Sequence, residues 1–391
     1  MTVTYQYSTL QTEDDAVGYT RACVLAFGGK AGEIRPWVDA NSAHARVVRQ
    51  DDRIVGGLLA LPMGQFFGQK RVAMVGISGV AVPPEARGHG AATVLMQSTL
   101  RRLRRAGVAI SALYPAVFGL YRRVGYEHAG GLYRIRVPPR SIRIKDRSLP
   151  VRPMEEADMR AVRALYRTWA STRAGWLDRG EYIWGRVTRD RGKQDHPGFV
   201  IEGDEGIEGH AIYYQKPAAE WYELRVTSLV GRTPEASMRL LGFLADHGSL
   251  ASEIIWYGGV DDPLFALLPE HGAKMELVEP WMLRIVHVAN ALAERGYPRG
   301  VSARLEIAVR DDTLRGNRGK YILDVDGGDG RVKTGGRGSL ELDIRALASL
   351  YSGHMSPYRL AEMGAIQGSP RALATAATVF AGPPPSMCDF F

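Results

Sequence analysis

The chain has 391 residues, of which 45% are hydrophobic and 24% are charged. At roughly 150 residues per domain the length corresponds to two or three domains, and the composition excludes a disordered or fibrous chain. The 45 glycines follow no G-X-Y period, which excludes collagen. The net charge of +8 favours an anionic partner, either a nucleotide cofactor or a nucleic acid.

Cysteine usage and hydropathy narrow the class further. Cys23 and Cys388 lie far apart without a C-x-x-C motif, so neither a disulfide framework nor a metal site is predicted. No apolar leader follows Met1 and no run reaches 18 apolar residues, so we expect a cytoplasmic protein without a membrane partner. Basic residues are not interleaved with aromatics, and the arginines between 101 and 105 suit a helix C-terminus better than nucleic acid.

The first third of the chain alternates predicted strands and helices. Strands are expected at 45–49, 53–61 and 71–82, the last one ended by a Pro-Pro pair that cannot extend a ladder. Apolar residues at helical spacing predict a helix at 91–105. A strand at 108–113 and a short helix at 117–123 follow.

The pattern restarts after residue 150. A helix at 155–172, a hairpin at 199–215, a strand at 223–230, a helix at 234–246 and a strand at 254–257 repeat the order of the first third, which indicates a divergent tandem pair. Beyond residue 290, short strands between 305 and 344 and helices between 344 and 381 predict a small α+β module. We therefore predict an α/β (α+β) chain with domains at 1–150, 151–290 and 291–391.

The segment with the clearest chemistry joins the strand at 71–82 to the helix at 91–105. It reads Arg87-Gly88-His89-Gly90-Ala91-Ala92, with the spacing R-x-x-G-x-A. Glycines before a helix N-terminus let unpaired backbone N–H groups surround a pyrophosphate. An ordinary strand-loop-helix turn is the alternative. The glycine fingerprints of nucleotide hydrolases and dinucleotide-dependent oxidoreductases are absent from such a setting.

The run GVAVPPEARGHGAATVLM, followed by LYRRVGYE, resembles the acetyl-CoA site of the GNAT superfamily of N-acetyltransferases. The resemblance implies that the strand binds the pantetheine arm and that the loop binds the pyrophosphate of acetyl-CoA. The cofactor-binding residues would be Val80, Ala81, Val82, Arg87, Gly88, His89, Gly90, Ala91 and Ala92. No metal is expected.

The resemblance extends over nearly the whole chain to the Eis (enhanced intracellular survival) family of aminoglycoside acetyltransferases. That family has two tandem GNAT domains, the second without a usable cofactor loop, and a third domain like sterol carrier protein. Here the second unit has Val230-Gly231-Arg232-Thr233-Pro234, which lacks the R-x-x-G-x-A spacing. The resemblance also implies a homo-oligomer, a hexamer.

Acetyl transfer needs a proton donor for the leaving thiolate, a base for the amine and a stabilised oxyanion. Tyr126 is the candidate donor, because a phenol with a pKa of about 10 can protonate a thiolate; packing at a helix end is its alternative role. By resemblance the α-carboxylate of Phe391 is the base, against the alternative of a frayed terminus. The backbone N–H of Val80 is the candidate oxyanion donor.

The candidate amine-binding residues are Phe27, Trp37 and Gly79. An aromatic wall suits a cationic substrate, although two aromatics can equally belong to the core. Family members often carry a bulky residue at the position of Gly79 and an acidic one near Gly29, so this chain is predicted to have a wider and less negative pocket.

The leading hypothesis is an acetyl-CoA-dependent N-acetyltransferase that acts on primary amines of cationic small molecules, aminoglycosides by resemblance. Acetylation of protein lysine or polyamines is the alternative within the same chemistry. A catalytically silent CoA- or lipid-binding protein is the alternative of another class, and Tyr126 with an intact R-x-x-G-x-A loop argues against it.

Overall fold

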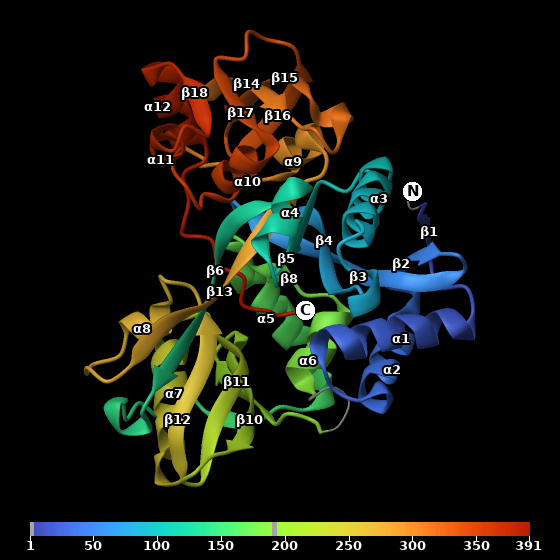
Figure 1. Cartoon of the computed structure of the whole chain (residues 1–391). Coiled ribbons are helices and arrows are strands. Elements are labelled where there is room, and N and C mark those ends of the chain that lie inside the picture. Colours follow the sequence, from blue (N-terminus) through green and yellow to red (C-terminus); the bar gives the residue numbers. More distant parts are fainter. Residues whose placement is uncertain (1–3, 190–193) are drawn as a thin grey trace.

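The computed structural model describes residues 4–189 and 194–391 of the chain. Three parts follow one another in Figure 1: a blue-to-cyan first unit, a green-to-yellow second unit and an orange-to-red third domain. The predicted order of two GNAT-like units and a third α+β domain is the order of the structure. Among the described helices none is long and apolar enough to cross a membrane.

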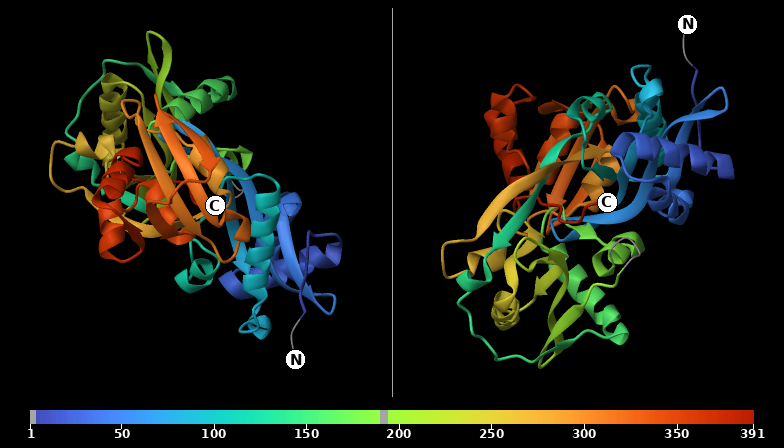
Figure 2. Two further views of the ribbon diagram at one scale, coloured as in Figure 1. Left: turned by 90° about the horizontal axis from the view of Figure 1, so that it is seen from above. Right: turned by 60° about the horizontal axis from the view of Figure 1, so that its bottom comes forward.

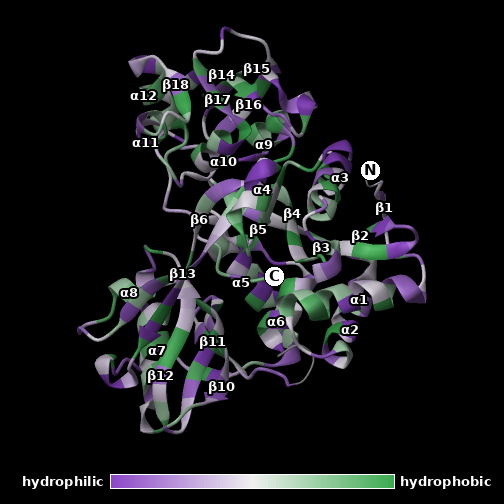
Figure 3. Cartoon of the chain, in the orientation of Figure 1, coloured by the Kyte–Doolittle hydropathy of each residue, from purple (hydrophilic) through white to green (hydrophobic). Residues whose placement is uncertain are grey.

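The first unit is a strand-rich layer covered by helices. Its elements are β1 (Gln6–Ser8), α1 (Glu13–Phe27), α2 (Ala31–Ala40), β2 (Ala45–Gln50), β3 (Arg53–Phe67), β4 (Lys70–Ala81), α3 (Ala91–Arg105), β5 (Ile110–Leu113), α4 (Phe118–Arg123) and β6 (Glu127–Val137). The helix predicted at 91–105 has these bounds in the structure. Its last turn is basic, as the helix dipole favours, and this end of α3 is purple in Figure 3.

The second unit repeats the strand-helix-strand order of β4, α3 and β5. Its elements are β7 (Val151–Pro153), α5 (Met159–Ser171), β8 (Leu177–Asp178), α6 (Glu181–Thr188), β9 (Gly198–Gly203), β10 (Gly206–Pro217), β11 (Tyr222–Gly231), α7 (Pro234–Ala245), β12 (Ala251–Gly258), α8 (Pro263–Ala266) and β13 (Lys274–Ile285). The parallel pair β4 and β5, joined by α3, has its counterpart in the parallel pair β11 and β12, joined by α7.

The two units exchange strands within one sheet. Its order is β1-β2-β3-β4-β5-β13-β6-β12-β11-β10-β9-β7, so β13 of the second unit lies between β5 and β6 of the first. β6 in turn pairs with β12, with Ile254 opposite Val137. The units therefore share a continuous hydrogen-bonded layer, and the domain limits at residues 150 and 290 stay a prediction.

The sequence predicts no element for either exchanged strand. Pro280 lies inside β13 and cannot donate to a ladder, and register shifts after Leu277 and Trp281 interrupt its alternation. β6 carries Gly130 and Gly131 in its middle. The alternation of apolar and polar residues within each segment therefore does not predict a strand. Both strands are stabilised by pairing across the two units.

The third domain packs a five-stranded sheet against helices. Its elements are α9 (Val288–Glu294), β14 (Ala303–Arg310), β15 (Gly319–Asp326), β16 (Asp329–Thr334), β17 (Leu340–Asp343), α10 (Ile344–Ser352), α11 (Pro357–Glu362), β18 (Ile366–Gly368) and α12 (Pro370–Val379). The sheet order is β16-β15-β14-β17-β18. After α12 the chain returns to the two units, where the Ser386 and Met387 N–H groups donate to the Ala174 and Gly131 carbonyls, and Figure 2 shows the C-terminal end over this part of the molecule.

Candidate active site

The first fork is the point at which β4 and β5 stop pairing. The two strands are bonded in parallel from Met74 opposite Ile110 to Gly76 opposite Ala112. Beyond that pair, β4 continues to Ala81 while β5 ends one residue later. Backbone groups of β4 beyond the fork have no partner on β5, so an extended ligand can pair with them as an additional strand.

A β-bulge bends β4 beyond this fork. The register shifts from Ser78 opposite Leu59 to Ala81 opposite Gly57, which leaves one extra residue on β4. Gly79 sits in the bulge with a φ of 59°, where a side chain would be strained. The Tyr19 hydroxyl donates to the Gly79 carbonyl at 2.9 Å and fixes the bulge.

The loop before α3 is open where a phosphate would lie. Gly88 and Gly90 have φ values of 81° and 91°, and a Cβ at either position would meet no atom within 4 Å. No side chain caps the helix at Gly90, so the N–H groups of its first turn remain available for an anion. The guanidinium of Arg87 is exposed beside them, with Nε donating to the Val82 carbonyl at 3.1 Å. This loop and helix end have the chemistry of a phosphate-binding site.

Tyr126 is fully buried at the first fork. Its hydroxyl lies 2.8 Å from Ser111 Oγ, and Ser111 itself donates to the Val75 carbonyl at 2.7 Å, so Tyr126 is the donor in the first bond. Burial raises the pKa of Tyr126 and outweighs the lowering by the Ser111 hydrogen bond and the charge of Arg284. The phenol is therefore protonated at neutral pH and can act as a proton donor.

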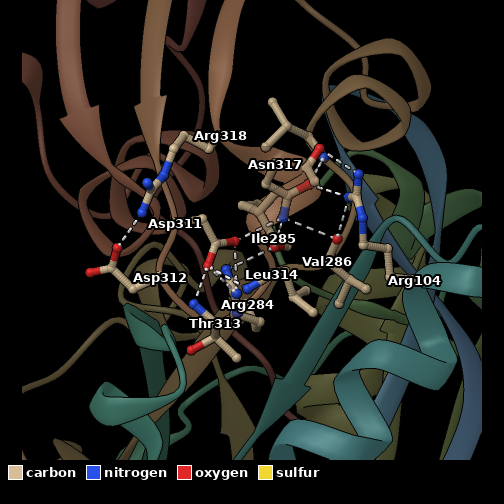
Figure 4. A network of polar contacts seen from close by, with 12 residues as sticks. Arg104, Arg284, Ile285, Val286, Asp311, Asp312, Thr313, Leu314, Asn317 and Arg318 are labelled. Carbon is tan, nitrogen blue, oxygen red and sulfur yellow. Dashed lines mark hydrogen bonds and ion pairs between the residues drawn. The ribbon is translucent and has the colours of Figure 1, made fainter.

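Arg284 of β13, whose charge acts on Tyr126, forms a buried ion pair with Asp311 of the third domain, and Figure 4 shows this pair. Both oxygens of Asp311 accept from the Arg284 guanidinium, at 2.9 and 2.8 Å, and both side chains are almost completely buried. Asn317 donates to the same carboxylate at 2.9 Å. Arg284 lies under Gly125, where a Cβ would come within 2.8 Å of its Cζ. The third domain thus braces the backbone beside Tyr126.

Phe391 reaches the first fork from the other end of the chain. It is 5% exposed, and its ring packs against Gly76, where a Cβ would lie 2.6 Å from ring atom Cε2. The next aromatic, Phe390, is half exposed and stacks on Tyr114 at 4.7 Å. The predicted burial of the terminal phenylalanine is thus a feature of the structure.

Tyr126 and Phe391 approach this fork from opposite faces of the sheet. The Tyr126 hydroxyl group is tied through Ser111 to Val75, whereas Phe391 packs on Gly76, and consecutive residues of a strand face opposite sides. Tyr126 packs in a cluster with α3 and α4, and Phe391 in the core that contains α1 and α5. The fold thus places a residue of the first unit and the C-terminal residue of the chain on the two faces of the first fork.

The candidate amine-binding residues lie on the α1–α2 side. Trp37 is half-buried, and its ring fills the space beside Gly79, where a Cβ would lie 2.5 Å from Cη2. The Glu33 carboxylate lies 3.9 Å from the position of a Cβ on Gly29. Phe27 is 57% exposed at the end of α1. Trp37 therefore stands where a bulkier residue at position 79 would, and Glu33 supplies a negative charge near Gly29.

Several residues of the candidate site lie in no motif that would identify them from the sequence. Ser111 lies in an apolar strand, Tyr19 in a helix, and Arg284 and Asp311 belong to different predicted domains. Each matters through a contact with a residue distant in sequence, so only the tertiary structure reveals it.

Comparison with known proteins assigns families to the three parts. Residues 8–129 and 175–285 each match an acetyltransferase (GNAT) domain, and residues 288–388 match a sterol carrier protein domain. The chain is 27% identical to an uncharacterized N-acetyltransferase of Streptomyces griseus, over 79% of each protein. It is 26% identical to the N-acetyltransferase Eis of Mycobacterium tuberculosis, over 73% of this chain and 72% of that protein.

Solved structures agree over the full length. A GCN5-related N-acetyltransferase from Anabaena variabilis superposes with a TM-score of 0.95 and 36% identity, covering 99% of this chain and 100% of that one. Eis1 from Mycobacterium abscessus shares the fold, with a TM-score of 0.81 at 22% identity and the same coverage.

The fold and the two matching GNAT domains define an acyltransferase with two GNAT units. The chain belongs to the GCN5-related N-acetyltransferase superfamily and is an Eis-like N-acetyltransferase.

Proposed function

We propose that the protein transfers the acetyl group of acetyl-CoA to primary amines of cationic small molecules, with aminoglycosides as the substrate class that the Eis resemblance implies. The observation that carries this proposal is the placement of Tyr126 and Phe391 on the two faces of the first fork, together with the open, uncapped N-terminus of α3. A silent CoA-binding protein would not need a buried phenol at the end of the open strand.

The donor site is assigned to three parts of the first unit. Residues Arg87 to Ala92 and the first turn of α3 hold the diphosphate, and Val80, Ala81 and Val82 pair with the pantetheine arm. When bound, acetyl-CoA supplies an activated thioester carbonyl. The backbone N–H of Val80, in the bulge, is assigned to the carbonyl oxygen as it becomes negative.

The proton movements are assigned to Tyr126 and Phe391. Tyr126 protonates the leaving sulfur, since burial keeps its phenol protonated at neutral pH. A carboxylate with an ordinary pKa of about 3.5 is too weak to deprotonate an ammonium of pKa about 10 directly. The Phe391 carboxylate therefore attracts the cationic acceptor by its negative charge, and the neutral fraction of the amine attacks the thioester carbonyl. The carboxylate then accepts, through a water molecule, the proton that the nitrogen carries in the tetrahedral intermediate.

The acceptor is held by an aromatic and acidic wall. Trp37 presents an indole ring beside Gly79, and Glu33 adds a carboxylate near Gly29. Both features attract cations. Phe27 extends this wall on the exposed side. Polyamines and protein lysine carry the same ammonium group, so they are the alternative acceptors.

We further propose a cytoplasmic homo-oligomer, a hexamer as the resemblance implies.

The test is release of free CoA from acetyl-CoA across a panel of amines that includes an aminoglycoside, spermidine and a lysine peptide. The intact chain is compared with Tyr126→Phe and with a form that lacks Phe391. We expect both variants to bind acetyl-CoA, measured by calorimetry, and to lose turnover. Unchanged turnover would remove both catalytic assignments, and absence of CoA release with every amine would favour the silent binding protein.

A further inference from the structure

The second unit contains a fork that corresponds to the first one. β11 and β12 pair in parallel as far as Arg225 opposite Ile255, after which they stop pairing. A small pocket opens at this second fork, lined by residues 226–229 of β11, by Trp256 and Tyr257 of β12, by Arg179, which follows β8, and by Cys388. In the first unit the corresponding place is assigned to the acyl end of acetyl-CoA. Here the chain's own C-terminal segment lies against it.

A buried cation faces this segment. The Arg179 side chain is 3% exposed and pairs with the Asp389 carboxylate, with Nε at 3.1 and 2.9 Å from its two oxygens. Among the described residues, the one carboxylate that forms an ion pair with Arg179 is that of Asp389. A buried guanidinium without an anion is strongly unfavourable, so the site requires an acidic residue at this point of the tail.

Other contacts fix the orientation of Arg179. It donates to Ser228 Oγ of β11 at 2.8 Å and lies over the ring of Tyr166 at 3.8 Å. Ser228 is also bonded to His210, at 2.8 Å. Burial and the charge of Arg179 lower the pKa of His210 to about 3, so this imidazole is neutral and does not compete for the carboxylate. Arg179 is therefore the positive charge that Asp389 meets here.

Backbone contacts hold the residues just before Asp389. Ser386 N–H donates to the Ala174 carbonyl at 2.9 Å, and Met387 N–H donates to the Gly131 carbonyl at 3.3 Å. Gly175 has a φ of 84° and a Cβ there would lie 2.8 Å from the Ser386 carbonyl oxygen, so a side chain would push the tail away. The segment is thus bound along its length like a peptide ligand.

We propose that the second fork is a peptide-binding socket whose occupant is the chain's own segment 386–389, and that Arg179 holds Asp389 there and thereby positions Phe391 in the first fork. Two residues span at most about 7 Å, so fixing Asp389 confines Phe391 to its place. Arg179 is a positioning residue, and the catalytic consequence rests on the base role proposed for Phe391.

The test reads the position of the tail independently of acetyl transfer. The intact protein is treated with carboxypeptidase A, and loss of Phe391 is followed by intact mass. We expect Arg179→Met and Asp389→Asn to release Phe391 about tenfold faster than the wild type or more, because the tail leaves the socket more often. Asp15→Asn breaks another buried Arg–Asp pair, with Arg49 in the first unit, and is expected to leave the protection unchanged.

Arg179→Met and Asp389→Asn each leave the other charge buried without a partner, which can unfold the protein. Two further variants test the proposal without that charge imbalance. Ser228→Ala removes one hydrogen bond of Arg179 and is expected to give a smaller acceleration. Exchange of the charges, Arg179→Asp with Asp389→Arg, is expected to restore part of the protection. Release no faster than wild type in Arg179→Met and Ser228→Ala, with unchanged melting temperatures, would overturn the socket.

Acetyl transfer separates this proposal from the proposed function. With a working base at Phe391, Arg179→Met lowers kcat about as much as deletion of Phe391 and leaves the KM for acetyl-CoA unchanged. If the tail is released and kcat is unchanged, the socket stands and the base role of Phe391 fails. If the tail stays protected, the socket fails whatever the rate.

Discussion

The two forks have the same strand topology and opposite occupancy. At the first fork the loop before α3 is open, and a buried phenol stands beside the last paired residues of β4 and β5. At the second fork the pocket is small and the side chains that meet there bind the tail. In the proposed mechanism, one scaffold thus serves for catalysis in one unit and for support of the C-terminal end of the chain in the other.

The helices that follow the two forks show why only the first suits a phosphate. α3 begins at Gly90 without a side-chain cap. α7 begins at Thr233, whose Oγ accepts from the Ala236 N–H, and Pro234 has no N–H to offer. Thr233 also donates to Glu208 at 2.8 Å, which places a carboxylate at this helix N-terminus. The second helix end is capped and negatively charged, so it disfavours an anion.

The largest expected effect is on kcat, and it comes from replacing the tyrosine of the first fork but not the tyrosine of the second. Tyr126→Phe removes the proton donor of the first fork and is expected to lower kcat by roughly 10²–10⁴-fold. Tyr257→Phe, at the second fork, removes a hydroxyl that has no role in the proposed reaction, and it is expected to leave kcat unchanged. Steady-state CoA release with one amine measures both. A comparable loss in the two variants would contradict an active site confined to the first fork.

The pH profile sharpens the same assignment. Burial raises the pKa of Tyr126 above its ordinary value of 10, so its protonated form persists through the alkaline range. We expect the rate to rise with pH as the amine loses its proton, with no alkaline fall below about pH 10. A fall near pH 8 that tracks the enzyme and not the amine would contradict this donor.

A second comparison concerns the third domain, which braces the first fork through Arg284. Asp311→Asn leaves this guanidinium buried without a carboxylate and is expected to cost about 3–5 kcal/mol of unfolding free energy. Asp312→Asn is the matched control, because its carboxylate is exposed and pairs with Arg318 at the surface. Urea denaturation followed by tryptophan fluorescence measures both. Equal midpoints for the two variants would show that the brace contributes nothing.

The open and closed helix ends give the next prediction. Gly90→Ala places a side chain at a φ of 91° and is expected to cost about 1–2 kcal/mol, which weakens acetyl-CoA binding about tenfold or more. Thr233→Ala removes the cap of α7 and is expected to lower stability without changing the dissociation constant. Calorimetric titration with acetyl-CoA measures both constants. An unchanged constant for Gly90→Ala would place the diphosphate elsewhere.

The sequence predicted those parts of the molecule whose signals are local. The helix at 91–105, the strands around the first fork and the three-part order follow from periodicity, glycines and prolines within a few residues. The open loop before α3 follows from Gly88 and Gly90 in the same way. These features depend on backbone freedom and burial pattern, which neighbouring residues largely determine.

The parts that could not be predicted depend on contacts between distant segments. The exchange of β6 and β13 pairs strands from two units, and no local pattern specifies which edge a strand joins. The bond from Tyr126 to Ser111 and the pair of Arg179 with Asp389 likewise join residues whose proximity only the fold creates. From the sequence, an arginine is expected at the surface, and its burial can be predicted only when its ion-pair partner is known.

The smallest expected effect concerns a feature that the two units have kept in common. Each has an aspartate at the start of its first long helix that pairs with an arginine of the neighbouring sheet: Asp15 with Arg49, and Asp158 with Arg152. At Asp15 burial raises the pKa, but hydrogen bonds from Arg49 and the backbone outweigh it and the pKa is lowered. At Asp158 the hydrogen bond from Arg152 lowers the pKa to about 2.

A lowered pKa in the folded state means that the ionised carboxylate stabilises the fold above the unfolded pKa of 3.8. This contribution is lost as the pH falls through the folded value of about 2. We therefore expect Asp158→Asn to be less stable than the wild type between pH 5 and 7 by a small amount, with the difference vanishing between about pH 4 and pH 2. Thermal melts at fixed ionic strength measure it. A difference that is constant across this range would show that Asp158 acts through its hydrogen bond from the Glu155 N–H alone, so that the ion pair common to both units contributes no charge-dependent stability in the second.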